Sequence, residues 1–240
     1  MLKLFNTLKM NASLWELNKA ERRRRILVAA RRLISKKGFE GLTMRDLADA
    51  ARVSVPTVYN LVGGKVSLLA ALVEEVYANV VAKLGDPERH DTFVSAAMEL
   101  CAVGHGEVLL APEYYRELIG LFLVSKEAQP IRKSLAERNI ELMTRVVASG
   151  QARGEIVDWV DPASLSATLY SQYISATIDW ANRKLDDDAL QATTSYGHAL
   201  ILLGVARGRA FTKLEDLARM HQNAARPTTA VQSRKGARSR

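Results

Sequence analysis

The chain has little of the chemistry from which enzyme active sites are usually built. Its 240 residues include one cysteine and four histidines. The carboxylates are scattered, without the spacing of a metal site or the motif of an activated nucleophile. A single cysteine also excludes an internal disulfide framework and fits a reducing cytosol. We therefore expect a cytoplasmic protein that is not an enzyme and that binds no metal or other cofactor.

Long apolar runs and strand patterns are missing as well. No stretch approaches the length of a membrane helix, so we expect no membrane partner. Residues 1–19 are too polar and too interrupted for a signal peptide. No segment alternates with period two over the length of a strand between turn signals, and no repeat of fixed period occurs. With 48% hydrophobic residues in helical spacing, the chain is expected to be all-α with a sizeable core.

Positive charge is concentrated in the first quarter of the chain. Residues 1–65 hold 14 Lys and Arg against 5 Asp and Glu, whereas residues 66–224 hold 15 against 21. The last residues, 225–240, hold five basic residues and no acidic one. A charge run is often only a solvated helix face, but this one flanks two short predicted helices. A basic N-terminal part, here called the head, in front of an acidic remainder predicts that the head binds a polyanion.

The stretch LTMRDLADAARVSVPTVYNLVGGKVSLL, Leu42 to Leu69, predicts two short helices joined by a tight turn. Thr43 is a good N-cap, and Asp46 follows at a position that favours an acidic side chain. The apolar face of the first helix is Met44, Leu47, Ala48 and Ala51. After a break at Arg52, Ser54 can cap a second helix, with Val58, Leu61 and Val62 apolar. Such a pair is a helix-turn-helix, whose second helix enters the DNA major groove.

The order of residues is more specific than this pattern. T-x-R-D-L-A-x-x-A-x-V-S-x-x-T-V-Y, followed five residues later by a lysine and two leucines, resembles the DNA-binding domain of the TetR family of bacterial regulators. The resemblance covers about Glu21 to Leu72 and rests elsewhere on helix order and length. It implies an N-terminal three-helix helix-turn-helix domain followed by a C-terminal helical ligand-binding and dimerisation domain.

Four segments are expected. They are a flexible N-terminal arm over 1–18, the helix-turn-helix domain over 19–66, the helical ligand-binding and dimerisation domain over 67–224, and a disordered basic tail over 225–240. The first helix should end at Gly38, and a gap is expected at Gly104-His105-Gly106. Beyond the paired helices, we expect helices over about 19–37, 65–84, 91–103, 112–124, 129–152, 162–183 and 186–207, and a short last one that begins with a capping box at 212–215.

The resemblance implies a division of DNA contacts. Thr43 would clamp a phosphate through its hydroxyl and backbone N–H, and Tyr59, Lys65 and Ser54 would reach the sugar-phosphate backbone. Thr43 and Ser54 can instead act only as caps, and Tyr59 can pack its ring against the protein. Nothing in helix packing requires a lysine at position 65.

The exposed side of the second helix would read bases. Thr57 and Asn60 can hydrogen-bond base edges, while Val55 and Pro56 can touch thymine methyl groups. Arg45 would reach a phosphate or a base, or would be an ordinary solvated arginine. The sequence departs from the family at Arg52, where glycine is common, so this residue has to tolerate a left-handed backbone. It also lacks the histidine and phenylalanine that often follow the tyrosine.

In the second domain the resemblance implies a ligand pocket and a dimer interface. Aromatic and methionine residues at helical spacing are candidates for a pocket that suits a hydrophobic molecule, although such residues more often belong to an ordinary core. They are Phe93, Met98, Tyr114, Tyr115, Phe122, Met143, Trp159, Tyr170, Tyr173 and Trp180. The last two long helices would form the homodimer interface. Their small residues allow close packing: Ser166, Ala167, Ser171, Ala176, Gly197, Gly204 and Ala206.

The expected function is that of a dimeric TetR-type repressor, which binds a palindromic operator in double-stranded DNA and is released by a small hydrophobic effector. The alternative is a DNA-binding structural or interaction protein that has the same head but is controlled by a partner protein. Cys101 and His198 fall in apolar helical contexts and should be buried and inert. His90, His105 and His221 fall in or near expected loops and have no evident partners.

Overall fold

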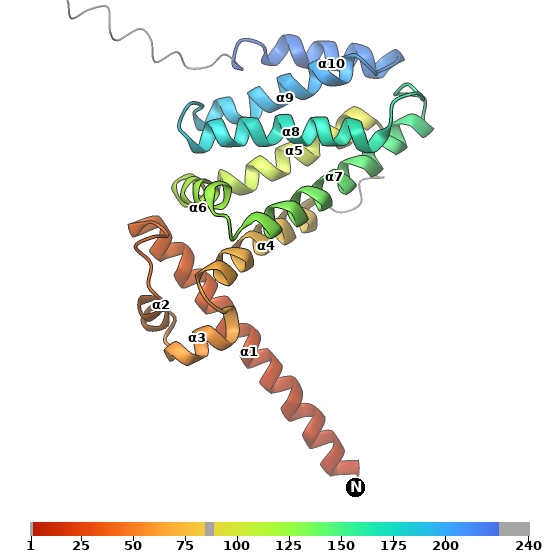
Figure 1. The fold of residues 1–240 in the computed structure, drawn as a ribbon. Helices are drawn as coiled ribbons and strands as arrows, with labels where there is room; N and C mark the ends of the chain where they lie inside the picture. Colours follow the sequence, from red (N-terminus) through yellow and green to blue (C-terminus); the bar gives the residue numbers. More distant parts are fainter. Residues whose placement is uncertain (1, 85–88, 226–240) are drawn as a thin grey trace, which may run out of the picture. The chain divides into compact units, whose positions relative to one another are not determined.

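A computed structural model describes residues 2–84 and 89–225, which form ten helices, α1 to α10 (Figure 1). The expected all-α class is confirmed. Of the expected basic tail, residues 226–240 lie outside the described residues, as do residues 85–88, between the expected helices over 65–84 and 91–103.

The helices group into two compact units. The head comprises the chain up to Ala78 together with Leu121–Ile131, and the body comprises Asn79–Gly120 and the chain from Arg132 onward. The expected boundary at residue 66 differs from this division, because α4 (Lys65–Leu84) is one continuous helix that contributes residues to both units.

The first helix is longer than the sequence pattern indicated. α1 runs from Leu2 to Lys37, so residues expected to form an arm continue the helix that was predicted to begin at 19. Residues 2–37 contain no proline or glycine, and nothing in the local sequence interrupts the backbone hydrogen bonds. The helix ends as predicted at Gly38, which has φ +70° and donates its N–H to the carbonyl of Ile34 at 2.9 Å.

The head buries one face of α1 against the two short helices, α2 (Met44–Ala51) and α3 (Val55–Val62). The apolar stripe of α1 is buried at Ile26, Leu27, Ala30 and Ile34, and Leu33 is half-buried. The first turns of α4 add three more buried leucines. The core residues contributed by these helices are Ile26, Leu27, Ala30, Ile34, Leu47, Ala48, Ala51, Val58, Val62, Leu68, Leu69 and Leu72.

The body is built around α9 (Asp187–Leu203), which packs against α5 (Phe93–Val108), α8 (Pro162–Ala181) and α10 (Gly208–His221). α6 (Pro112–Val124) and α7 (Gln129–Ala152) complete the set (Figure 1). One apolar core joins five of these helices through side chains such as Phe93, Val147, Leu169, Leu202 and Leu214. Burial of each such side chain contributes about 1.5–3 kcal/mol to folding.

Two expected features of the body are wrong, because packing overrides local signals. α5 continues through Gly104-His105-Gly106 without a gap. A Cβ on Gly104 would lie 2.7 Å from the Tyr173 hydroxyl oxygen, so this glycine permits a close helix contact.

The boundary between the last two helices also differs from expectation. α9 ends at Leu203 because the backbone then pairs with the 155–157 segment, where Val157 N–H donates to the Val205 carbonyl at 2.9 Å. α10 begins at Gly208, before the expected capping box, and its cap Arg207 makes no side-chain cap hydrogen bond. Burial of Ala210 and Leu214 in the core holds this early turn in place.

Candidate nucleic-acid interface

The first cap of the helix-turn-helix is a complete capping box. Thr43 Oγ1 accepts from the Asp46 N–H at 3.1 Å and donates to Asp46 Oδ2 at 2.6 Å, and the Thr43 N–H donates to the same oxygen at 3.2 Å. Lys37 forms an ion pair with Asp46 as well. These bonds, that from Lys37 first, hold the pKa of Asp46 at about 2. Both Thr43 donors thus serve the cap, and a phosphate contact would require one of them to be exchanged.

The second cap places the start of α3. Ser54 Oγ accepts from the Thr57 N–H at 3.3 Å and lies 2.7 Å from Thr57 Oγ1. Pro56 occupies the first turn, where its missing N–H costs no helical hydrogen bond. Because a hydroxyl has one donor and two acceptor sites, Thr57 keeps capacity for a base edge while it is bonded to Ser54.

One side of α3 is buried and the other is open. Val58 and Val62 are buried in the head, whereas Pro56, Asn60 and Tyr59 are exposed, Tyr59 by 52%. Val55 and Thr57 are half-buried, and Arg45 on α2 is exposed. The side chains expected to read bases thus lie on α3, with Pro56 and Asn60 exposed and Val55 and Thr57 half-buried.

Lys65 has a structural role that its sequence position did not reveal. Its Nζ donates to the carbonyls of Glu40 at 3.1 Å and Phe39 at 3.4 Å, and it lies 5.6 Å from the centre of the Phe39 ring. The lysine therefore ties the start of α4 to the turn after α1. An ammonium group carries three N–H donors, so one remains for a phosphate.

Arg52 adopts the left-handed conformation that its position requires, with φ 55° and ψ 52°. This confirms the expectation drawn from the departure from glycine. A non-glycine residue in this region is strained, because its Cβ crowds the neighbouring carbonyl. The turn nevertheless keeps its helix-ending hydrogen bond, from Arg52 N–H to the Asp49 carbonyl at 3.2 Å.

The expected pocket residues of the body fall into separate environments. Phe93 and Met143 are packed in the main core, with Met98 against its edge. Trp159 is 73% exposed and was wrongly predicted as a pocket residue, because it lies on the connection between α7 and α8. Phe122 belongs to the segment that groups with the head.

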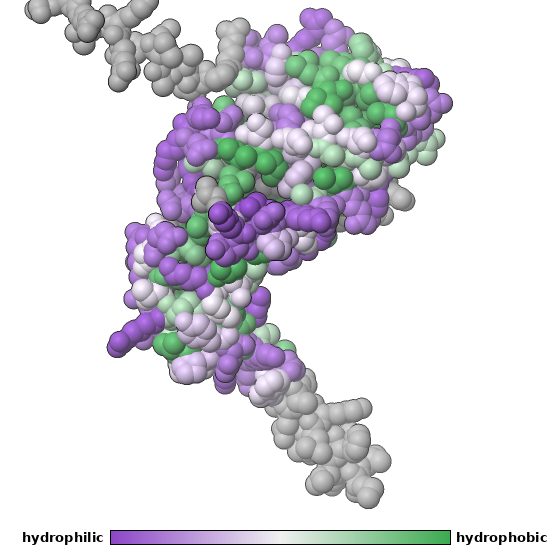
Figure 2. Space-filling model, in the orientation of Figure 1, coloured by the Kyte–Doolittle hydropathy of each residue, from purple (hydrophilic) through white to green (hydrophobic). Residues whose placement is uncertain are grey.

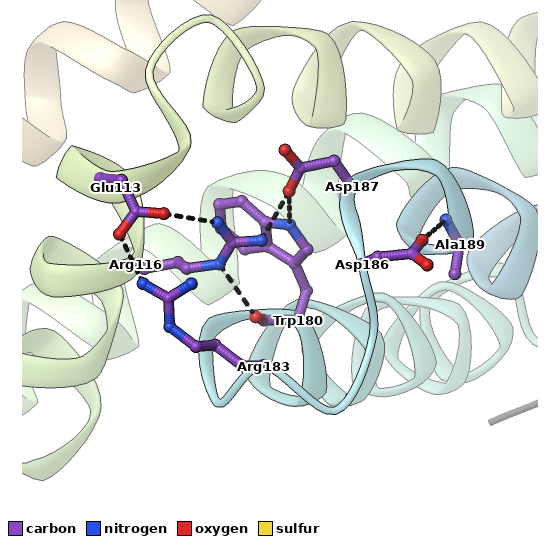
Figure 3. Close-up of polar contacts among 7 residues, drawn as sticks. All are labelled: Glu113, Arg116, Trp180, Arg183, Asp186, Asp187 and Ala189. Carbon is purple, nitrogen blue, oxygen red and sulfur yellow. Dashed lines mark hydrogen bonds and ion pairs between the residues drawn. The ribbon is translucent and has the colours of Figure 1, made fainter. Parts of the chain in front are cut away.

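Trp180 is held in a polar anchor (Figure 3). The guanidinium carbon of Arg116 lies 4.5 Å from the centre of the indole ring, and Trp180 Nε1 donates to Asp187 Oδ1 at 2.8 Å. Arg116 Nη2 donates to the same oxygen at 2.5 Å, and Glu113 bridges Arg116 and Arg183. This arrangement joins α6, α8 and α9. Contacts within the protein therefore explain the position of the Trp180 side chain without a ligand.

A second polar cluster lies between α5, α8 and α9. The rings of His105 and Tyr173 stack with centres 4.7 Å apart, and His105 Nε2 lies 3.5 Å from Thr194 Oγ1. His198 Nε2 donates to the Leu169 carbonyl at 2.9 Å, so its Nδ1 accepts from the Cys101 thiol at 3.1 Å.

Burial sets the protonation of this cluster. Desolvation lowers the pKa of His105 to about 4 and raises that of Cys101 to about 12. Cys101 and His198 are buried as predicted. The expectation that His105 lies near a loop without partners is wrong. Tyr170, whose pKa burial raises to about 12, lies near this cluster.

Tyr114 and Tyr115 are buried together on α6, with ring centres 4.8 Å apart. A cavity of about 10 Å³ lies elsewhere in the body, lined by Leu84, His90, Ala96, Glu99, Leu100, Leu142 and Val146. It has room for about one water molecule.

Residues 26–72 match the sequence profile of the family described as bacterial regulatory proteins, tetR family. The head of the chain is therefore similar to the DNA-binding domain of the TetR family. The HTH-type transcriptional repressor KstR of Mycobacterium tuberculosis is 41% identical over 63 residues, a match that covers 26% of this chain and only 29% of that relative.

Solved structures resemble the chain over most of its length. SmeT, the repressor of the multidrug efflux pump SmeDEF of Stenotrophomonas maltophilia, aligns with a TM-score of 0.63 at 20% identity, covering 79% of this chain and 92% of that one. A TetR-family regulator from Marinobacter aquaeolei VT8 aligns with a TM-score of 0.62 at 14% identity, covering 83% and 98%. At these identities the likeness concerns the fold.

Among the described residues, no group of three or more histidine, cysteine or carboxylate side chains lies close enough to hold a metal ion. In the same part of the chain no single helix has the length and apolarity of a membrane span. Only the pair formed by α5 and residues Pro112–Leu123 of α6, bent by 103° at the break between them, has the required length and apolarity when the two are taken together.

Proposed function

We propose that the protein is a homodimeric transcriptional repressor that binds a palindromic operator through α3 of each protomer and is released by a small hydrophobic effector. The observation that carries the DNA-binding part is the open side of α3, with Asn60 and Pro56 exposed on a capped helix within a strongly basic head. In helix-turn-helix proteins the N-terminal residues of this helix contact base edges. The match of residues 26–72 to the sequence profile of the TetR family supports the proposal.

The dimer would form through α8 and α9. Leu200 on α9 is 48% exposed, and α8 exposes a stripe of small side chains that includes Thr168 and Ser171. Figure 2 shows apolar surface gathered on the part of the body where α9 and α10 lie. Gly197 does not belong to this surface, because a Cβ there would collide with Gln172 inside the same protomer. Burial of the apolar side chains against a second copy would stabilise the dimer.

Release would work through α4. In the head, Arg31 Nη2 lies 2.7 Å from Glu75 Oε1 and fixes α4 to α1. In the body, Lys83 Nζ and Asn79 Nδ2 donate to the Glu107 carboxylate at 2.5 and 2.8 Å and fix α4 to α5. A ligand that displaces α5 would therefore move α4 and, through it, the head.

Two recognition helices of a dimer must match half-sites about 34–36 Å apart. The effector must bind the released arrangement better than the DNA-bound one. A crosslink between the two heads at the DNA-bound spacing should therefore abolish release. Release that survives the crosslink would contradict this mechanism.

The alternative, control by a partner protein, is favoured by one observation: Phe93, Met143 and Trp180 are accounted for by core packing or by the Arg116 anchor. A small-molecule effector should raise the melting temperature of the free protein, whereas a partner-controlled protein should show no such shift with any metabolite.

The experiment that tests the proposed function is selection of bound sequences from a random DNA pool, followed by a screen of hydrophobic metabolites for release. Enrichment of a palindrome is the expected result. Failure to enrich any sequence would contradict the DNA-binding proposal, and failure of every metabolite would favour the partner-controlled alternative.

A further inference from the structure

An open groove in the head is lined by four arginines. It has a volume of about 340 Å³ and lies between one face of α1 and the end of α2. Arg24, Arg25 and Arg32 come from α1, and Arg52 comes from the turn before α3. Val28, Ala29, Ala50 and Ala51 make up the rest of the lining. No carboxylate lines the groove.

The charge of the groove is only partly balanced by protein groups. Glu21 bonds Arg24 through two contacts of 2.8 Å and lies near the charge of Arg25. Arg25 Nε is buried, and no described residue gives it a hydrogen-bond partner. Arg32 and Arg52 form no ion pair within residues 2–84 and 89–225. A buried donor without a partner is costly, so an anion in the groove would satisfy Arg25 and relieve the repulsion among like charges.

Arg52 places the groove next to the start of the proposed recognition helix, α3. It holds a strained left-handed backbone at φ 55°, and it stands two residues before Ser54, the N-cap of α3. The first residues of a recognition helix meet base edges at the floor of the major groove, and a phosphate backbone borders that groove. The guanidinium fork binds phosphate in a bidentate manner, which a lysine does not.

We propose that Arg25, Arg32 and Arg52 form a phosphate clamp that holds one backbone phosphodiester of the operator beside each recognition helix. This inference rests on the proposed DNA binding and adds a contact outside α3. The clamp reads no bases, so it sets affinity and position along the duplex, and sequence preference stays with α3.

The test compares Arg52→Gly, Arg32→Ala and the double variant with the wild-type chain on the selected operator, over a range of salt concentrations. Each single variant should weaken binding about tenfold and lower the salt slope by about one unit, with base preference unchanged. The double variant should lower the slope by about one unit as well, because both side chains hold the same phosphate.

Arg52→Gly separates the clamp from a structural role. Glycine adopts the left-handed conformation without strain, so this variant should melt at the same temperature as wild type or higher while it binds DNA more weakly. Arg209→Ala on α10 removes one exposed charge outside the groove and is the matched control, which should leave the slope unchanged.

The outcomes are distinguishable. If wild type binds no DNA, the proposed function fails. If wild type binds and both single variants keep its affinity and slope, the clamp is wrong while the function stands. An operator with one neutral methylphosphonate at the clamped position should make wild type and Arg52→Gly bind equally. Saturable binding of inorganic phosphate that requires Arg52 but leaves operator binding unchanged would assign the groove to a free anion and would also overturn the clamp.

Discussion

Lys83 Nζ lies 2.5 Å from the carboxylate of Glu107, which is only 4% exposed. Burial raises the pKa of this carboxyl, but hydrogen bonds from Lys83 and Asn79 outweigh burial and hold the pKa below its ordinary value. The carboxylate therefore stabilises the fold at neutral pH, and this contribution is lost as the pH falls below that ordinary value, about 4.5.

Removal of this charge should be costly. We expect Glu107→Gln to lower the free energy of unfolding at pH 7 by about 1–3 kcal/mol, because one buried hydrogen bond and the ion pair to Lys83 weaken together. Urea unfolding measures the change. Glu137→Gln is the control, since its contact with Lys133 at 3.9 Å is exposed and should contribute less than about 0.5 kcal/mol. Equal effects of the two variants would contradict the account of Glu107.

His105 predicts an acid-sensitive body. The pKa of His105 is about 4 in the folded protein, against 6.5 for an ordinary histidine in the unfolded chain. The unfolded chain therefore binds the proton first, and stability falls as the pH drops from above 6.5 toward 4. Between pH 7.5 and 5 this one side chain should cost roughly 2 kcal/mol. His105→Phe keeps a ring against Tyr173 and should lose correspondingly less over that range. Parallel pH profiles of the two proteins would rule out His105 as the cause.

Lys65 and Asn60 should have separable effects on DNA binding. Lys65→Ala should weaken every operator variant about equally and lower the salt slope by about one unit. It should also lower the melting temperature, because the bonds to the carbonyls of Phe39 and Glu40 are lost. Asn60→Ala should relax preference at one base pair per half-site, by about 1–3 kcal/mol, with the slope nearly unchanged. If Asn60→Ala lowers the slope and keeps base preference, Asn60 contacts the backbone.

The proposed dimer gives a direct prediction for α9. Leu200→Arg places a charge on the apolar part of the α8–α9 face and should shift the protein toward monomers in sedimentation velocity. Leu110→Arg alters a side chain that is 71% exposed between α5 and α6 and serves as the control, which should stay dimeric. Persistence of dimers in the Leu200 variant would place the interface elsewhere.

The sequence was sufficient where local chemistry decides the structure. Short-range signals include the caps at Thr43 and Ser54, from which α2 and α3 were predicted. They also include the glycine at the end of α1, Gly38, and the prolines that open α6 and α8. The continuity of α5 through Gly104 and the early start of α10 depend on contacts with α8 and α9, which no local pattern contains.

The same division applies to the candidate site. The residues around α3 follow from the helical repeat, but the partners of Lys65 come from a turn 25 residues earlier in the chain. The arginine groove joins α1 to Arg52, and a charge count shows that a head is basic without showing where its arginines converge. Trp159 was misassigned because an aromatic residue on an exposed connection has the same sequence signature as one in a pocket.

Binding of the selected operator and of a scrambled duplex of equal length, measured by fluorescence anisotropy over increasing salt, tests the central claim most directly. The account predicts two protomers per operator, half-site centres about 10–10.5 base pairs apart or a multiple of that spacing, and an affinity at least about 10³-fold above that for scrambled DNA. The logarithm of the binding constant should fall linearly with the logarithm of the salt concentration. Equal affinity for both duplexes at every salt concentration would contradict the claim that α3 reads an operator.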